Sequence, residues 1–139
     1  MTMLPHNVPL KQLGADLTAL ARSLVGLLRT AESESGARLR GPEKLAAEHW
    51  SRQAIENVSA YLEELESALR RRSPTELQHA ASQLGSVSRY VNDYDYSWFT
   101  KEEDLARALS ALDNAATPIM TSIRRFDPRS LEAARRALE

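Results

Sequence analysis

Three histidines and a set of carboxylates are the side chains of this sequence that could take part in acid–base or metal chemistry. Histidine changes its charge near neutral pH, and the chain contains His6, His49 and His79. Glu76 and His79 are three residues apart, a spacing that places a carboxylate and an imidazole on one face of a helix. The chain has no cysteine, which excludes disulfides, thiolate zinc sites and cysteine nucleophiles.

The Glu76–His79 spacing resembles the Glu-x-x-His motif of ferritin-like di-iron bundles. Those sites use two copies of the motif and two further glutamates, and this sequence holds no second copy. We therefore expect no metal and no cofactor. Glu76 is interpreted instead as a residue that caps its helix, and His79 as a side chain on a partly exposed face.

Arg72 and His79 are separated by six residues, which resembles the Arg-x4-6-His motif of HEPN ribonucleases, also helical bundles. The resemblance implies a ribonuclease in which Arg72 and His79 work together in the cleft of a dimer. Here Ser73 and Pro74 lie between the two residues and predict a break that leaves Arg72 on the preceding helix. In the alternative interpretation, Arg72 only interacts with the negative end of that helix.

A longer stretch resembles histidine phosphotransfer domains, four-helix bundles in which a Leu-Glu-rich helix precedes a turn and a helix bearing His-x-Leu-Lys-Gly-Ser. The matching segments are residues 61–69, residues 73–77 and Gly85-Ser86. Aligned on Gly85, the phosphoacceptor position falls on Ala81 and the lysine position on Leu84. His79 lies two residues earlier, about 200° around a helix. The resemblance therefore implies a divergent bundle without the phosphoacceptor in register.

Five of the eight aromatic residues lie within ten positions, and two aspartates are interleaved with them. They are Tyr90, Tyr94, Tyr96, Trp98 and Phe99, with Asp93 and Asp95. Tyrosine and tryptophan are enriched in interface hot spots, and neighbouring carboxylates favour a basic partner. We interpret Tyr94, Tyr96, Asp93 and Asp95 as an exposed binding surface. Trp98 belongs either to this surface or, with Phe99, to the core at the end of the bundle.

A second, weaker candidate surface lies near the C-terminus, where Arg135 and Arg136 follow other arginines. Fifteen of the eighteen basic residues are arginine, which can bind carboxylates with two hydrogen bonds. The same bias is typical of a GC-rich genome, such as that of a bacterium or a phage. Leu131 and Leu138 make the last segment a docking helix if they find no contacts within the chain.

Apolar residues recur at steps of three and four along most of the chain, which predicts amphipathic helices. No strand pattern is found. Polar residues with two glycines at 32–41 predict the longest loop. The expected helices span residues 9–30, 43–72, 74–92, 101–125 and 128–138.

Capping signals set several of these boundaries. Ser73, Pro74 and Glu76 predict a helix start with a capping box. Residues 100–103 form a second capping box, and Asp127-Pro128 predicts the start of the last helix. Pro118 is expected to kink the fourth helix or to break it, with Thr117 as the cap of a restarted helix.

At 139 residues the chain has the size of one domain. Four long amphipathic helices with short connections bury their apolar faces most simply as an antiparallel four-helix bundle, with the short last helix added to it. We expect a single all-α domain over residues 1–139. The net charge of −1 argues against a nucleic-acid binder.

No apolar stretch reaches the roughly 20 residues that a membrane span needs, and residues 1–7 do not read as a secretory signal. A cytoplasmic protein without a membrane partner is expected. Phosphate-binding glycine loops and nucleophile motifs are absent from the sequence.

The leading hypothesis is a non-enzymatic protein–protein interaction module: an adaptor, an inhibitor or an immunity-type factor. Its partner is another protein, and assembly into a homodimer is compatible with the pattern. The alternatives are a HEPN-like ribonuclease using Arg72 and His79, and a divergent phosphotransfer-like bundle.

Overall fold

The computed structural model describes residues 9–139. His6 and the predicted absence of a secretory signal at residues 1–7 lie outside this range. Within this range the chain forms five α-helices and no strand. They are α1 (Leu10–Arg38), α2 (Gly41–Arg71), α3 (Pro74–Asn92), α4 (Glu102–Ser122) and α5 (Pro128–Ala137).

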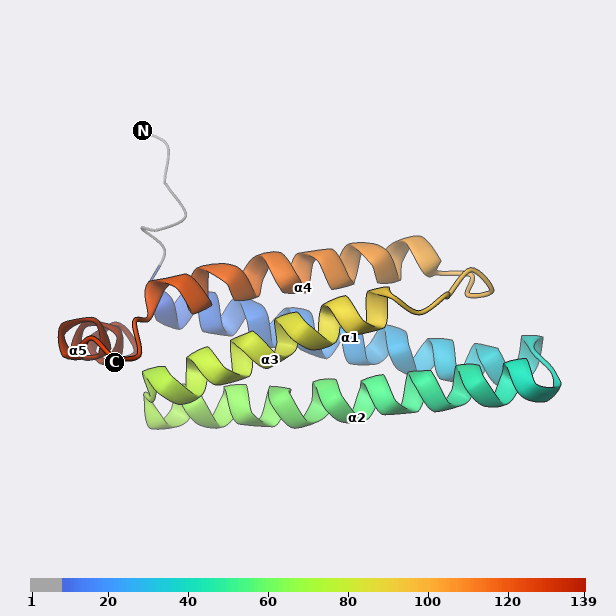
Figure 1. Cartoon of the computed structure of the whole chain (residues 1–139), viewed down its shortest axis with the longest axis horizontal. Helices are drawn as coiled ribbons and strands as arrows, with labels where there is room; N and C mark the ends of the chain where they lie inside the picture. The colour runs from blue at the N-terminus through green and yellow to red at the C-terminus, as the bar shows by residue number, and fades with distance from the viewer. Residues whose placement is uncertain (1–8) are drawn as a thin grey trace, which may run out of the picture.

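The four long helices form an antiparallel bundle, which confirms the predicted fold class. Each packs against the next helix in the chain, and α4 also packs against α1, so the ring of contacts is closed. Figure 1 shows the long helices side by side, with α5 across the end of the bundle where α2 ends and α3 begins. Contacts of α5 with α1 and α3 attach it there.

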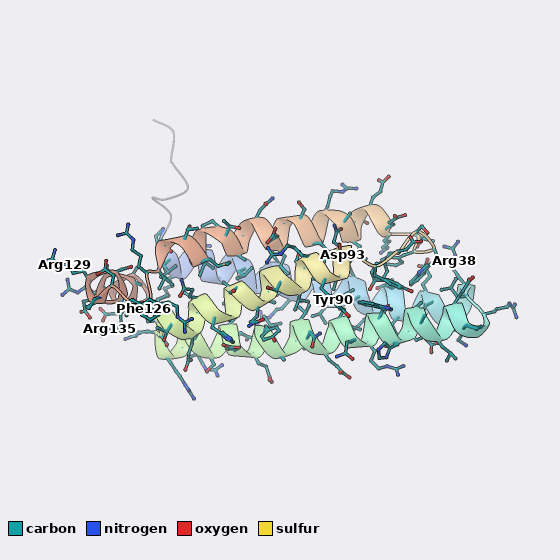
Figure 2. The ribbon with its side chains drawn as sticks, in the orientation of Figure 1. Arg38, Tyr90, Asp93, Phe126, Arg129 and Arg135 are labelled. Carbon is teal, nitrogen blue, oxygen red and sulfur yellow. The ribbon has the colours of Figure 1, made fainter. Side chains whose placement is uncertain are left out.

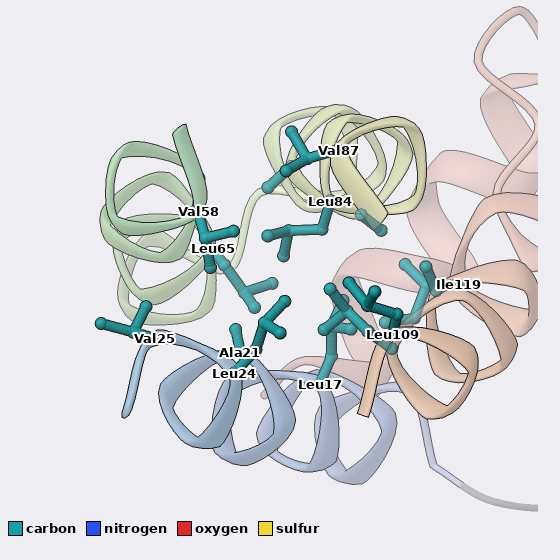
Figure 3. Close-up of a cluster of buried hydrophobic side chains, with 14 of the residues drawn as sticks. Leu17, Ala21, Leu24, Val25, Val58, Leu65, Leu84, Val87, Leu109 and Ile119 are labelled. Carbon is teal, nitrogen blue, oxygen red and sulfur yellow. The ribbon is translucent and has the colours of Figure 1, made fainter. Parts of the chain in front are cut away.

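Leucines dominate the core, as the apolar pattern predicts. Leu17 and Leu24 of α1 meet Leu65 of α2 and Leu84 of α3, and all four side chains are fully buried. Ile119 joins them from α4 (Figure 3). Residues seven apart, such as Leu17 and Leu24, lie on the same face of a helix after two turns, so one stripe per helix is enough to fill the interior.

The predicted loop at residues 32–41 is wrong. Helix α1 continues to Arg38, and only Leu39 and Arg40 connect it to α2. The buried stripe continues through Ala31 and Ser35, both without exposed surface. Small side chains at these positions allow close packing of helices, and they carry no apolar signal strong enough to reveal a helix in the sequence.

The capping predictions have mixed outcomes. The Ser73 hydroxyl accepts the backbone N–H of Glu76 at 3.4 Å, and the Asp127 carboxylate accepts the N–H of Arg129 at 3.0 Å, so both N-caps are confirmed. The Glu76 half of the predicted capping box is wrong, because the Ser73 N–H donates to the carbonyl oxygen of Ala68 and the Glu76 carboxylate faces Arg71. The capping box at residues 100–103 is wrong, because α4 has Lys101 at its N-cap position without a side-chain cap. Thr100 donates to α1 instead.

Pro118 does not break α4, which runs through it to Ser122. Thr117 is not a cap, because its hydroxyl donates to the carbonyl oxygen of Asp113 one turn earlier, at 3.0 Å. Helix α4 packs against α1 and α3, and Ala116 and Ile119 on either side of the proline are fully buried, so packing holds the helix together across the missing N–H group.

Candidate functional site

Six of the eight aromatic residues of the chain form a continuous series of ring contacts, here called the aromatic ladder. In order, the members are Tyr90, Trp50, Tyr94, Tyr96, Trp98 and Phe99. Successive ring centroids are 4.7, 5.1, 4.8, 5.7 and 6.0 Å apart. These separations lie in the range of favourable aromatic pairs.

Trp50 is the residue that links the ladder across two helices. It lies on α2, and its ring contacts Tyr90 at the end of α3 and stacks on Tyr94 just beyond, with 20° between the Trp50 and Tyr94 planes. Tyr94 lies two residues beyond α3, where its backbone N–H donates to the carbonyl oxygen of Val91 at 3.1 Å, and this turn keeps its ring beside α2. The sequence does not reveal that Trp50 belongs to this group, because a contact between residues 40 positions apart leaves no local signal.

The two ends of the ladder differ in exposure, and Tyr96 near its middle is buried. Tyr90 is 51 % exposed, Trp50, Tyr94 and Trp98 are half-buried, and Phe99 is buried as predicted. Tyr96 is only 5 % exposed, so the prediction that it lies on the surface is wrong. Tyr96 lies in the turn that follows α3, and its ring packs between those of Tyr94 and Trp98. The open end of the ladder is therefore Tyr90, Trp50 and Tyr94.

The buried end of the ladder contains polar atoms without hydrogen-bond partners among the described residues. They are the hydroxyls of Tyr96 and Ser51 and the indole N–H of Trp98. Burial raises the pKa of Tyr96 to about 12. Burial likewise raises the pKa of Tyr94, and the charges of Asp95 and Glu43 add to this shift.

Carboxylates surround the open end. Asp93 and Asp95 are exposed, and Glu43 at the start of α2 is close enough to Tyr94 to act on its pKa. The Asp95 carboxylate accepts the backbone N–H of Ser97 at 2.9 Å, which lowers its pKa and fixes the turn. Asp93 has no ion pair among the contacts of residues 9–139. We call the surface of Trp50, Tyr90, Tyr94, Asp93 and Asp95 the aromatic face, and Figure 2 labels Tyr90 and Asp93 of it.

A hydrogen-bonded clasp holds the α3–α4 connection against α1. The Glu34 carboxylate accepts the backbone N–H of Thr100 at 2.7 Å and its hydroxyl at 2.8 Å, and Arg38 donates to it at 3.0 Å. Partial desolvation raises the pKa of Glu34, but these hydrogen bonds outweigh it and the net shift is downward. The clasp lies in the segment that the sequence predicts to be a loop.

The arginines of the second predicted surface form hydrogen bonds within α5. Arg135 and Arg136 both donate to the Glu132 carboxylate, at 2.8 and 3.3 Å. The hydrogen bond from Arg135 is the largest cause of the lowered pKa of Glu132. Leu138 is buried and Leu131 packs against the core, so the apolar side of α5 finds its contacts within the chain.

Arg72 and His79 have separate surroundings. Arg72 is exposed at the end of α2 in a left-handed conformation, with φ 54° and ψ 43°. His79 is exposed on α3, where Nδ1 contacts the Glu64 carboxylate at 2.5 Å and Nε2 faces the Gln83 amide at 3.3 Å. No contact in the described part of the chain joins Arg72 to His79.

The structure also bears on the other two resemblances. Ala81 and Leu84, which align with the chemical positions of phosphotransfer domains, are fully buried in the core. Glu76 lies 3.6 Å from Arg71 across the α2–α3 turn. Within residues 9–139, no group of three or more histidine, aspartate or glutamate side chains could hold a metal ion.

No family model, no curated protein and no solved structure matches this chain. None of the helices in the described range is both long and apolar enough to cross a membrane.

Proposed function

We propose that the chain is a non-enzymatic protein–protein interaction module that binds a basic partner through the aromatic face. The observation that carries this proposal is the stack of Tyr90, Trp50 and Tyr94, left partly open to solvent beside carboxylates. Large stiff rings lose little conformational entropy on binding, and they dominate the energy of many interfaces.

The chemistry of the face favours arginine or lysine on the partner. A cation above the ring of Trp50 or Tyr90 gains cation–π energy, at most sites about 0.5–2 kcal/mol. Asp93 can accept two hydrogen bonds from the same guanidinium or its neighbour. A module of this kind acts as an adaptor, an inhibitor or an immunity-type factor, because each of these needs binding alone.

Capture from host lysate with tagged wild-type protein and Tyr90→Ala tests the proposal. Tyr90 is the residue to substitute because half of it is already exposed, so its loss should disturb the core little. Any captured protein is then purified and titrated by calorimetry. We expect a basic partner that binds wild type, binds Tyr90→Ala at least about tenfold more weakly, as for a hot-spot residue, and binds less tightly at high salt.

Leu45→Ser is the matched control. Leu45 is also exposed, at 68 %, and also lies on α2. It is five residues before Trp50, which places it about 140° around the helix and away from the aromatic face. Equal affinity of wild type and Tyr90→Ala, or an equal loss in Leu45→Ser, contradicts the proposal.

A further inference from the structure

A fully exposed phenylalanine surrounded by arginines lies at the end of the bundle that carries α5. Phe126 is 98 % exposed in the turn between α4 and α5. Arg124, Arg125 and Arg129 beside it are exposed as well. Figure 2 shows Phe126 and Arg129 at the end of the bundle where α5 lies. We call these four residues the arginine tip.

The tip is held in a defined shape. The Arg124 N–H donates to the Ser130 hydroxyl at 2.9 Å, and the Asp127 N–H donates to the Arg124 carbonyl at 3.1 Å. Ile123, directly before the tip, is buried. The phenyl ring is thus held in water by a hydrogen-bonded turn, although exposing an aromatic ring of this size is unfavourable.

The fold itself makes no use of the Phe126 ring. Helix α5 is anchored by Ala134 and Leu138, which are buried. Arg124 lies 3.9 Å from the Asp127 carboxylate, whereas Arg125 and Arg129 form no ion pair in the described part of the chain. Two cations and one aromatic ring are therefore available to a partner.

The arginine tip and the aromatic face have complementary chemistry. The aromatic face offers open rings and carboxylates, and the arginine tip offers a ring and cations. Phe126 can stack on Trp50 or Tyr90, and the arginines can pair with Asp93 or lie over the rings. We propose that the arginine tip of one copy docks on the aromatic face of a second copy. This inference rests on the proposed function and names one partner of the same face.

The tip cannot reach the face of its own chain. The Gln78 amide donates to the carbonyl oxygen of Ile123 at 2.6 Å, so the tip lies beside Gln78 on α3. Tyr90 is twelve residues further along that helix, which corresponds to about 18 Å. The contact must therefore join different copies. Because the two surfaces differ, it is head-to-tail, and it builds open chains or closed rings.

Sedimentation velocity of the purified protein at increasing concentration tests this inference. We expect wild type and Leu45→Ser to associate more strongly as concentration rises, and to associate less at high salt because the contact is electrostatic in part. Phe126→Ser and Tyr90→Ala should each weaken association at least about tenfold. Asp93→Arg serves as a second face variant, and circular dichroism checks that every variant is folded.

The decisive experiment mixes two variants that each fail to self-associate. Phe126→Ser keeps an intact face, and Tyr90→Ala keeps an intact tip, so an equimolar mixture should form a dimer that neither variant forms alone. A face-to-face dimer would not be rescued by mixing. Three outcomes overturn the inference: wild type stays monomeric, the single variants still associate, or the mixture stays monomeric. Binding of anionic vesicles through Phe126 by a monomeric protein would also overturn it.

The capture experiment described above is repeated with Phe126→Ser, which cannot self-associate through its tip. If wild type does not self-associate, but wild type and Phe126→Ser both capture a partner that Tyr90→Ala binds weakly, only this inference is overturned. If neither wild type nor Phe126→Ser captures a partner, or if Tyr90→Ala captures it equally well, the proposed function is overturned.

Discussion

The ring of Tyr96 stabilises the fold by packing, whereas its buried hydroxyl destabilises it. The ring fills the space between Tyr94 and Trp98, while the hydroxyl is buried without a hydrogen-bond partner in the described part of the chain. Its phenolate would lose hydration on burial, which is why the pKa rises to about 12. The folded state therefore binds the phenolic proton more tightly than the unfolded chain.

This shift predicts a loss of stability at high pH. The stabilising effect is complete below the unfolded pKa of about 10 and is lost as pH rises towards the folded pKa of about 12. We expect the melting temperature of wild type to fall more steeply in this range than that of Tyr96→Phe, which cannot ionise. Parallel profiles of the two proteins would contradict this assignment.

Arg72 is strained by its left-handed backbone, with φ 54°. Glycine adopts this conformation without a Cβ clash. We predict that Arg72→Gly raises the free energy of unfolding by about 0.5–1 kcal/mol in urea titrations. Arg71→Gly, within α2, is the control and should lower it by about 1 kcal/mol. A destabilised Arg72→Gly would contradict the strain argument.

The same variant tests the ribonuclease alternative, which stays a prediction. If the wild-type protein cleaves RNA, and Arg72→Gly and His79→Ala both lose cleavage while remaining folded, the two residues act together. The contacts of His79 with Glu64 and Gln83 give no support to that pairing.

At the scale of elements, two glycines of α1 have opposite surroundings. A Cβ on Gly14 would lie 2.6 Å from the Leu69 Cδ2 atom, whereas a Cβ on Gly26 would meet nothing within 4 Å. Gly26→Ala should therefore raise the free energy of unfolding by about 0.5–1 kcal/mol through helix propensity. Gly14→Ala should gain less or lose stability, because Leu69 must move. Equal effects in chemical denaturation would refute the difference in packing.

The Glu34–Thr100 clasp predicts sensitivity to acid. The pKa of Glu34 is lowered in the folded chain, so the stabilising effect is present above the unfolded pKa of about 4.5 and is lost as pH falls through the folded pKa. We expect wild type to lose thermal stability below this pH more steeply than Glu34→Gln. Tryptophan fluorescence reports the release of the α3–α4 connection, since Trp98 lies in it. Identical acid profiles would show that the clasp does not stabilise the fold.

The sequence predicts elements best where leucines repeat, and worst where small residues pack. The boundaries of α3 follow from Ser73, Pro74 and the periodicity of its apolar residues. The last turns of α1 do not, because Ala31 and Ser35 are buried without being strongly apolar. Thr100 has the type and spacing of a cap, but a carboxylate on another helix offers it a better partner.

At the scale of the whole molecule, the bundle separates two surfaces of different chemistry. The aromatic face lies where α3 ends, and the arginine tip lies beyond the end of α4. The cluster of aromatic residues predicts the neighbourhood of the face. It does not reveal Trp50, nor which tyrosine is buried, because both depend on how α2 and α3 pack. The exposure of Phe126 is likewise a property of the folded chain.

The most direct test of the central claim is the dissociation constant of a purified partner, measured with wild type and Tyr90→Ala at matched thermal stability. The account predicts binding at least about tenfold weaker for Tyr90→Ala, with an unchanged melting temperature, because half of this side chain is exposed. An unchanged dissociation constant would contradict the claim that the aromatic face binds. A variant that loses its fold would show instead that Tyr90 is part of the core.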